Sequence, residues 1–247
     1  MNILALDTSS RATSCAWMEE GVLRGEFFLN AEITHSQTIL PMVDALLESM
    51  GRKIEETDLF AVSCGPGSFT GLRIGVGAVK GMALALKKPC APVSTLYALA
   101  LNMQGVSGYI VPVMDARASQ VYTAAFYSEG GGSESLARLC DDMAIPIDQL
   151  LDMLLPFSGK PIVLVGDGAA LCRDAFAEKG FHVEIAPSTL LHQRAGSVCV
   201  AGRELAEQDN LVDSDTLQPV YLRLPQAERE RLAKIESEQG GGESAHE

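Results

Sequence analysis

The sequence predicts a two-lobed α/β protein in which one structural unit is used twice. Each half reads as three strands, then a helix, a strand, a helix, a strand and a helix. The first strand of each half ends in an aspartate, Asp7 or Asp115, which is followed by a polar turn. The fourth strand of each half ends in a glycine-containing turn. One such half is typical of many α/β domains, so the specific observation is that the same order occurs twice.

Periodicity and turn residues position the elements of the first half. Apolar runs predict strands at residues 1–6, 13–18, 22–29, 58–63 and 90–93. Apolar residues at helical spacing predict helices at residues 36–50, 71–86 and 95–103. We therefore expect a first lobe over residues 1–104.

The same signals recur in the second half. They predict strands at residues 109–114, 120–127, 134–140, 161–165 and 182–186. They predict helices at residues 147–154, 169–179 and 195–208. We expect a second lobe over residues 105–225, followed by an acidic, glycine-containing tail at 226–247 whose composition is typical of disorder.

Composition narrows the class of function. The 247 residues are 47% hydrophobic, close to an ordinary globular chain, and carry a net charge of −13. Phosphate backbones repel a strongly acidic chain, so we expect it to reach RNA only beside a basic partner. The six cysteines have neither C-x-x-C nor zinc-site spacing, which favours buried, reduced thiols.

Targeting signals are not evident in the sequence. The first residues lack the cationic segment of a signal peptide, and Asp7 interrupts the first apolar run. The longest apolar stretch, residues 72–86, contains Arg73 and Lys80 and is shorter than the roughly 18–20 residues of a membrane span. We therefore expect a cytoplasmic protein without a membrane partner.

Asp7 and Asp115 are candidates for ligand binding. Two carboxylates at strand ends that face one cleft can hold Mg²⁺ through water or orient an attacking water. The same side chains can instead cap their own turns by accepting backbone N–H bonds. Both alternatives stay open for each residue, while the duplication favours a ligand cleft between the halves.

The loop over residues 63–73 is the second candidate binding feature. Gly65 and Gly67 allow its backbone to approach a ligand closely, and the helix that follows presents unpaired N–H groups. Ser68 and Thr70 add hydroxyls that can contact a ligand or cap the helix. No Gly-Lys-Ser/Thr follows, so the loop is not a Walker A motif, and a tight connection into a capped helix is an equal alternative.

The helices predicted at 36–50 and 71–86 are more apolar than the sheet of one lobe requires. The second helix also carries four glycines, Gly71, Gly75, Gly77 and Gly81. Each glycine inside a helix costs roughly 1 kcal/mol relative to alanine, which indicates a compensating gain in close packing. Two such helices favour a surface that pairs with another subunit over a fully intramolecular core.

Catalytic side chains are not evident. His35 precedes a helix, where a capping or surface role is more common than catalysis. The other histidines, His182, His192 and His246, lack the spacing of a metal site. The sequence contains no G-x-S-x-G motif and no convincing Cys/His pair. We therefore expect neither a catalytic residue nor a group of side chains that binds a metal.

Four segments together resemble one known family. They read ILALDTS at residues 3–9, His35-Ser36, GPGSFTGLRIG at residues 65–75 and MDAR at residues 114–117. These segments resemble the TsaB (YeaZ) family, and the resemblance extends from the first residue to about residue 223. The duplicated order is similar to that of the actin, Hsp70 and sugar-kinase (ASKHA) class, in which the two first hairpins face each other across a nucleotide cleft.

The resemblance implies a role in tRNA modification. TsaB proteins take part in making threonylcarbamoyladenosine at position 37 of tRNAs that read codons starting with A. They bind the catalytic paralogue TsaD, the ATPase TsaE joins them, and they also form homodimers through the same helical patch. On this chain the implied interface residues are Ile39, Val43, Leu46, Leu47, Met50, Arg73, Val76 and Lys80.

One departure from TsaD matters. Where TsaD has a histidine-rich metal segment, this chain reads VSTLYALA at residues 93–100 and lacks both metal-binding histidines. A metal-assisted mechanism is then not available to this segment. We expect a non-catalytic partner of TsaD and TsaE that reaches tRNA only through the complex, with ATP or ADP and Mg²⁺ as candidate ligands at the interface. The alternative is a free-standing ATPase or small-molecule kinase.

Overall fold

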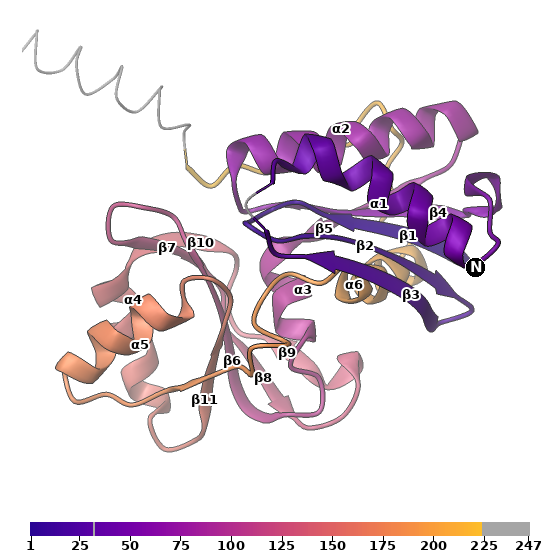
Figure 1. The fold of residues 1–247 in the computed structure, drawn as a ribbon. Helices are drawn as coiled ribbons and strands as arrows, with labels where there is room; N and C mark the ends of the chain where they lie inside the picture. Colours follow the sequence, from indigo (N-terminus) through magenta and orange to yellow (C-terminus); the bar gives the residue numbers. More distant parts are fainter. Residues whose placement is uncertain (32, 224–247) are drawn as a thin grey trace, which may run out of the picture.

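The computed structural model describes residues 1–31 and 33–223 (Figure 1). The tail expected at 226–247 lies outside these residues. Two sheets lie side by side, with helices on both faces of each sheet and a helical layer between them.

Five strands form the first sheet, in the order β3-β2-β1-β4-β5. β1 (Asn2–Asp7), β2 (Thr13–Glu19) and β3 (Val22–Leu29) form an antiparallel meander. β4 (Leu59–Gly65) pairs in parallel with both β1 and β5 (Cys90–Ser94). β1 and β4 are buried on both faces, as expected of apolar strands that are covered by helices on two sides.

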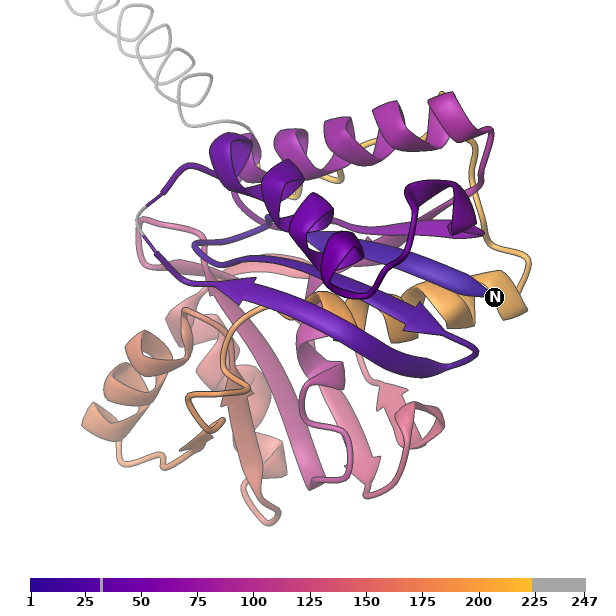
Figure 2. The same ribbon diagram turned by 45° about the vertical axis from the view of Figure 1, so that its right-hand side comes forward.

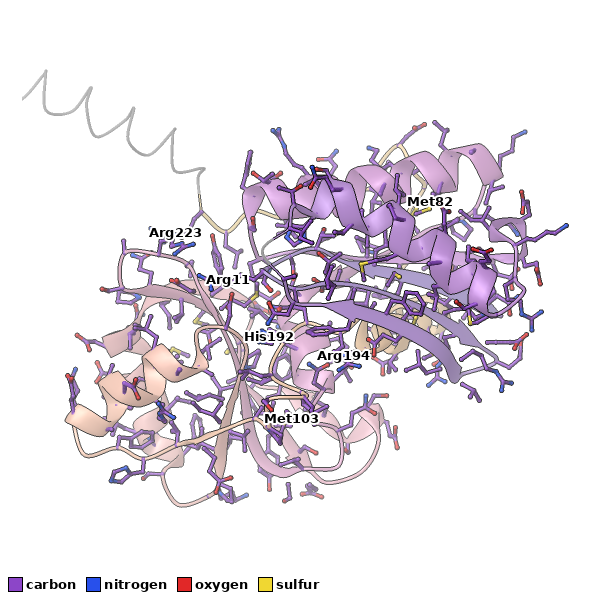
Figure 3. All side chains as sticks on the ribbon, in the orientation of Figure 1. Arg11, Met82, Met103, His192, Arg194 and Arg223 are labelled. Atoms are coloured by element: carbon purple, nitrogen blue, oxygen red, sulfur yellow. The ribbon has the colours of Figure 1, made fainter. Side chains whose placement is uncertain are left out.

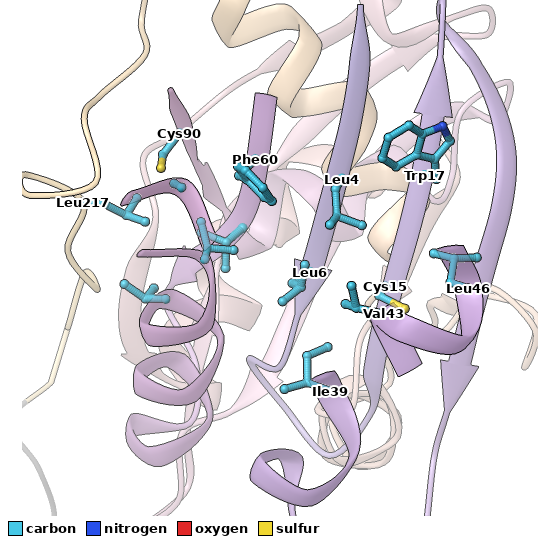
Figure 4. Close-up of a cluster of buried hydrophobic side chains, with 14 of the residues drawn as sticks. Leu4, Leu6, Cys15, Trp17, Ile39, Val43, Leu46, Phe60, Cys90 and Leu217 are labelled. Atoms are coloured by element: carbon cyan, nitrogen blue, oxygen red, sulfur yellow. The ribbon is translucent and has the colours of Figure 1, made fainter. Parts of the chain in front are cut away.

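Helices α1 (His35–Ser49) and α2 (Phe69–Leu86) cover one face of this sheet. Figures 1 and 2 show the two helices side by side above the strands. The core beneath them is built around Trp17, which is fully buried together with Leu4 and Leu46 (Figure 4). A single 3-10 turn, Ile54–Glu56, connects α1 to β4.

The opposite face of the first sheet is covered by α6 (Ala195–Glu207), which packs on β1, β2, β4 and β5. The contact is close because both sides carry small residues. A Cβ added to Gly202 would lie 2.7 Å from the Cβ of Ala61. Helix α3 (Thr95–Leu101) lies beside α6 and also contacts the second sheet.

The main path of the second sheet has the order β10-β7-β6-β11-β12. β6 (Ser107–Asp115), β11 (Ile162–Val165) and β12 (Glu184–Ile185) are parallel. β7 (Gln120–Thr123) is antiparallel to β6 and to β10 (Met143–Pro146). This arrangement repeats that of the first sheet, as the duplicated pattern predicts.

The strand predicted at 120–127 is divided in the structure, and the one predicted at 134–140 is shorter than expected. The first becomes β7 and β8 (Phe126–Glu129), which pair with different parts of β6. The second is reduced to β9 (Leu136–Arg138), after the 3-10 turn Ser133–Ser135, and β10, which follows it, was not predicted. At the break the backbone N–H of Ala125 donates to the Cys140 sulfur at 3.2 Å, so the ladder is interrupted there by a side chain.

Helices α4 (Ile147–Leu154) and α5 (Ala169–Glu178) cover the outer face of the second sheet, and the 3-10 turn Leu155–Phe157 follows α4. Helix α3 covers its inner face. Helix α6 was expected to close the second lobe at 105–225, yet it packs on the first sheet. Each lobe is therefore assembled from both halves of the sequence.

The chain after α6 returns along the first lobe and ends at the second. Val212 bridges to Cys90 at the edge of β5, and Leu217 is buried in the core beneath α2. The backbone N–H of Val220 donates to the Cys64 carbonyl at 2.7 Å. Arg223 then donates to backbone carbonyls of the second lobe. This segment, residues 212–223, is called the C-terminal strap below.

Helix α2 is longer than the apolar stretch seen in the sequence. By length and composition alone it is apolar enough to cross a membrane, and a third of it is buried in the lobe. Five of the six cysteines are buried and Cys140 is half-buried, which agrees with the expectation that these thiols lie inside the protein.

Burial on α1 predicts different costs for two leucines on the same helix. Leu46 is 1% exposed beneath the helix and Leu40 is 47% exposed on its outer side. Leu46→Ala should lower the free energy of unfolding by about 2–4 kcal/mol because it leaves a cavity. Leu40→Ala, the matched control, should change it by less than about 0.5 kcal/mol. Urea unfolding of both variants measures this, and equal losses would contradict the orientation of α1.

Candidate functional site

A cleft of about 1210 Å³ separates the lobes. Its walls come from the turn after β1, from the start of α2 and from the turn after β6. Tyr221, Leu222 and Arg223 of the C-terminal strap complete the lining. The two first hairpins therefore meet at this cleft, as the duplication predicts.

Asp7 is fully buried and does not line the cleft. One carboxylate oxygen accepts the backbone N–H of Ser9 at 2.9 Å and the Ser9 hydroxyl at 2.7 Å. The other accepts the hydroxyl of Ser63 on β4. Burial raises the pKa of this carboxyl, against the opposing effect of these hydrogen bonds. Of the two sequence alternatives, the turn-capping role describes Asp7, and the expectation that it faces a ligand is wrong for this structure.

The glycines of the loop between β4 and α2 approach the protein itself. A Cβ added to Gly67 would lie 2.4 Å from the Ser9 carbonyl oxygen, and one added to Gly71 would lie 2.0 Å from that of Thr8. Gly65 has φ +137° and lies against the carbonyl of Val220, 2.2 Å from the Cβ position. The loop therefore docks on the turn after β1 and on the strap, which requires glycine at these positions.

Two hydroxyls of this loop remain at the cleft. Ser68 caps α2, because its side chain accepts the backbone N–H of Gly71 at 3.3 Å, as predicted. Its own backbone N–H donates to the Ser9 carbonyl at 2.7 Å. Thr70 is exposed, and Gly67, Ser68 and Thr70 all line the cleft.

Asp115 lies at the cleft, at the end of β6. It accepts the backbone N–H of Arg117 at 2.8 Å and pairs with the Arg117 guanidinium at 3.6 Å. Asp167, in the turn after β11, accepts the backbone N–H of Asp115 at 3.2 Å. Burial raises the pKa of Asp167, against the opposing effect of the hydrogen bond from the Asp115 N–H. The predicted pair, Asp7 and Asp115, is replaced at the cleft by Asp115 and Asp167.

The turn after β6 has an unusual backbone. Arg117, Ala118 and Ser119 all have positive φ, at +66°, +53° and +54°. For residues other than glycine this conformation costs of order 1 kcal/mol each and persists only where the surroundings hold it. Arg223 donates to the carbonyls of Ala116 and Arg117, so the strap holds the turn at the edge of the cleft.

Sequence reasoning missed the cationic residues of the cleft. Arg11, Arg117 and Arg223 line it, together with His35 and His192. Figure 3 shows Arg223, Arg11 and His192 in succession along the gap between the lobes. Arg11 and Arg117 belong to the recurrent polar turns, so the duplication could have identified them. Arg223 has no such local signal.

The interface residues expected on α1 and α2 require a correction. Five of the eight are buried against the first sheet: Ile39, Val43, Leu46, Leu47 and Val76. Met50 is half-buried and packs on the same core, and Lys80 donates to the carbonyls of Asp215 and Leu217 at 3.2 and 3.1 Å. These side chains are the inner face of the helices, because apolar stripes pack first on the helices' own sheet. Arg73 is exposed.

The outer face of the two helices nevertheless exposes large apolar side chains, beside the charged Asp44 and Glu48 of α1. Leu84 is 63% exposed and Leu40 is 47% exposed. A Cβ added to Gly77 or Gly81 would meet no atom within 4 Å. Two glycines in an open stretch of helix therefore have no packing partner within the described chain, in contrast to Gly71 and Gly75 on its inner side.

Comparison with known proteins identifies the family. The family model TsaD, tRNA N6-adenosine threonylcarbamoyltransferase, matches residues 29–231. The tRNA threonylcarbamoyladenosine biosynthesis protein TsaB of Bacillus subtilis (strain 168) is 32% identical over 92% of this chain and 96% of its own length. The chain belongs to the TsaB family. TsaB of Escherichia coli (strain K12) is 31% identical over 90% of this chain and 95% of its own length.

A solved structure of this family has the same fold. YeaZ from Pseudomonas aeruginosa superposes with a TM-score of 0.74 at 27% identity, covering 90% of this chain and 99% of that one. The predicted two-lobed α/β class, with one unit used twice, is thus confirmed for this TsaB family member. Each of the four sequence segments that carried the resemblance contributes at least one residue to the lining of the cleft.

The buried carboxylate of Asp7 yields a test of its structural role. Asp7→Ala leaves the N–H of Ser9 and the hydroxyl of Ser63 without an acceptor, which should cost about 1–3 kcal/mol for each group. Asp7→Asn keeps a side chain of the same shape with one acceptor oxygen. Because burial raises the pKa of Asp7 and so disfavours its charge, this neutral substitution should lower the free energy of unfolding by less than about 1 kcal/mol. Urea unfolding at neutral pH compares the variants.

The pH dependence of stability shows whether the folded state favours the neutral or the ionised carboxyl of Asp7. The folded state holds the Asp7 proton more tightly than the unfolded chain, so ionisation favours unfolding as the pH rises above the usual value of 3.8. The free energy of unfolding of the natural chain, relative to that of Asp7→Asn, should therefore fall as the pH rises from 3.8 towards the raised pKa of the folded state. A relative gain would mean that the ionised carboxylate stabilises the fold.

Proposed function

We propose that this chain is a non-catalytic partner subunit in the synthesis of threonylcarbamoyladenosine at position 37 of tRNA. It binds the catalytic paralogue TsaD, supports it in an active form, and acts together with TsaE. The observation that carries this proposal is the similarity to TsaB proteins over nine-tenths of the chain. Exposed leucines and open glycines on the outer side of α1 and α2 support it.

The segment where TsaD binds its metal supports a non-catalytic role. Residues 93–100 run from the end of β5 into α3, and six of the eight are buried. Leu96 and Leu99 pack against the second sheet. Over residues 1–31 and 33–223, no group of three His, Cys, Asp or Glu side chains is placed to hold a metal ion.

The partner surface is proposed on the outer face of α1 and α2. A subunit interface needs apolar anchors with charged groups kept to its rim. Leu40, Leu84 and the open glycines are the apolar part of this face, and Asp44 and Glu48 of α1 are its exposed charges. Glycine at 77 and 81 allows a neighbouring helix backbone to approach closely. We propose that TsaD and a second copy of this chain compete for this face, and that tRNA is reached only through the complex because the chain is acidic.

A nucleotide site forms a further part of the proposal. Gly67, Ser68, Thr70 and Asp115 line the cleft and are available to ATP or ADP. Asp7 is hydrogen-bonded and Gly65 is packed within the chain itself. There is therefore less support for Mg²⁺ held jointly by Asp7 and Asp115. A free-standing ATPase or kinase was suggested by two carboxylates, Asp7 and Asp115. This alternative is not favoured, because Asp7 is buried and does not line the cleft.

A charge on the outer face tests the partner surface. Leu84→Glu should weaken association with the host's TsaD about tenfold or more, because an unpaired carboxylate is costly to bury. Leu171→Glu on α5, where the leucine is 47% exposed, is the matched control and should leave association unchanged. Size-exclusion chromatography with light scattering measures the homodimer on the chain alone and the hetero-complex on the mixture with TsaD. A folded Leu84→Glu chain that still binds TsaD would refute this surface.

The open glycines yield an independent test. Gly77→Ala should raise the free energy of unfolding by up to about 1 kcal/mol at dilutions where the chain is monomeric, because alanine favours helix and meets no neighbour. The same variant should weaken binding to TsaD in a titration. Gly202→Ala on α6 is the contrasting case and should destabilise the chain. Unchanged affinity of Gly77→Ala for TsaD would show that no backbone approaches position 77.

A further inference from the structure

The C-terminal strap is fastened to the first lobe at several points. Val212 and Cys90 exchange backbone hydrogen bonds of 2.9 and 2.8 Å at the edge of β5. The Lys80 ammonium on α2 donates to the carbonyls of Asp215 and Leu217 at 3.2 and 3.1 Å. The Leu217 side chain is itself buried in the core beneath α2. These contacts all lie within the first lobe, so the strap belongs structurally to that lobe.

The attachment of the strap to the second lobe is much smaller. Within residues 1–31 and 33–223, its hydrogen bonds to that lobe come from a single side chain. The Arg223 guanidinium donates through one terminal nitrogen to the carbonyls of Ala116 and Arg117. Both acceptors are neutral backbone groups, so this contact is not an ion pair. The strap therefore joins one lobe at several points and the other through one residue.

The turn that Arg223 contacts has a strained backbone. Its residues 117–119 all have positive φ, a conformation that residues other than glycine keep only where the surroundings hold it. Within the turn, the backbone N–H of Gln120 donates to the Arg117 carbonyl at 3.2 Å, and the N–H of Ala116 donates to the Gln120 carbonyl at 3.0 Å. Arg223 thus donates to a carbonyl that also closes the turn. Its loss should loosen these internal hydrogen bonds.

A continuous core joins the lobes at α3, away from the strap. Tyr97 of α3 packs against both the core between the first sheet and α6 and the core of the second sheet. Asn102, just after α3, donates to two backbone carbonyls of the loop that precedes α6. Figure 3 shows Arg223 at the upper end of the gap between the lobes and Met103, which belongs to the core at α3, at the lower end. Two lobes joined in this way can rotate about α3, while the strap spans the other end of the gap.

We propose that the strap is a latch between the two lobes, and that Arg223 is its closing contact. While Arg223 holds the turn after β6, the lobes keep the separation seen in this structure. Release of this one side chain lets the lobes rotate about α3 and widens the cleft, and the strap stays on the first lobe because its other contacts remain. The inference rests on the contacts of the strap alone and is independent of the partner surface and the nucleotide site proposed above.

The first experiment measures the distance between the lobes in the full chain. Spin labels are attached through Gln37→Cys at the start of α1 and Leu171→Cys at the start of α5, both exposed positions. Cys140→Ser is added so that the half-buried thiol is not labelled. Double electron–electron resonance is recorded with an excess of unlabelled chain, which removes distances between molecules. We expect one narrow distance with Arg223 present, and a broader distribution with a longer component in Arg223→Met.

Two further variants control this measurement. Arg223→Lys keeps a cationic donor at the same position and should restore the narrow distance, because the latch requires a donor to the turn carbonyls. Arg24→Met removes an exposed arginine of β3 that pairs with Glu19, and it should leave the distance unchanged.

Hydrogen exchange of the same variants, without labels, gives a second measurement. In Arg223→Met the amides of Ala116 and Gln120 should exchange at least tenfold faster, since the turn loses its outside contact. The Val220 amide, which donates to the Cys64 carbonyl at 2.7 Å, should keep its protection because the strap stays on the first lobe.

Three results would overturn the proposal. The first is an unchanged distance between the lobes in a folded Arg223→Met chain. The second is loss of protection at Val220 together with the turn, because the strap would then leave both lobes. The third is unfolding of Arg223→Met, seen by circular dichroism, because the strap would then maintain the fold itself and not the separation of the lobes. Association with TsaD and nucleotide binding are measured separately and do not affect these outcomes.

Discussion

The hydrogen bonds of Asp7 hold together the part of the molecule on which both candidate surfaces depend. Its carboxylate joins the turn after β1 to β4 in a site that water does not reach. With that turn fixed, Gly67 and Gly71 can dock on the carbonyls of Ser9 and Thr8. α2 then begins at a set position, with its first residues at the cleft and its outer stripe facing away from the sheet.

Helix α2 physically links these two surfaces. Phe69, at its start, lines the cleft and packs against Tyr221 of the strap, with ring centroids 4.7 Å apart. The Arg73 guanidinium lies 4.5 Å from the centre of the Phe69 ring and begins the exposed stripe that continues to Leu84. A subunit bound to the outer stripe therefore contacts a helix whose other end lies beside the ligand cleft and the strap.

The sequence predicted the fold better than the site. Strand ends in Asp7 and Asp115 and glycine turns at matching places were sufficient for the duplicated order, because local turn chemistry and apolar periodicity determine it. The division of the second strand of the second lobe into β7 and β8 was missed, since it depends on which half of β6 each segment pairs with. Local patterns contain no information on such pairing.

The orientation of side chains caused the main errors. Ile39 and Val43 were expected at a partner, but an apolar stripe does not reveal whether it faces its own sheet or another protein. The open glycines on α2 were in the sequence, yet only the surroundings distinguish Gly77 from Gly75. Asp7 had two equal interpretations, and Ser63, 56 residues away in the chain, decided between them.

The crossing of α6 has a consequence for the order in which the protein is made. During synthesis the first sheet emerges with one face uncovered, because the helix that covers it lies at residues 195–207. Its apolar and alanine-rich surface stays exposed until residues 195–207 have left the ribosome, and such surfaces are prone to aggregate. The first lobe cannot mature as an independent unit ahead of the second, so both lobes complete folding together, late and through contacts distant in sequence.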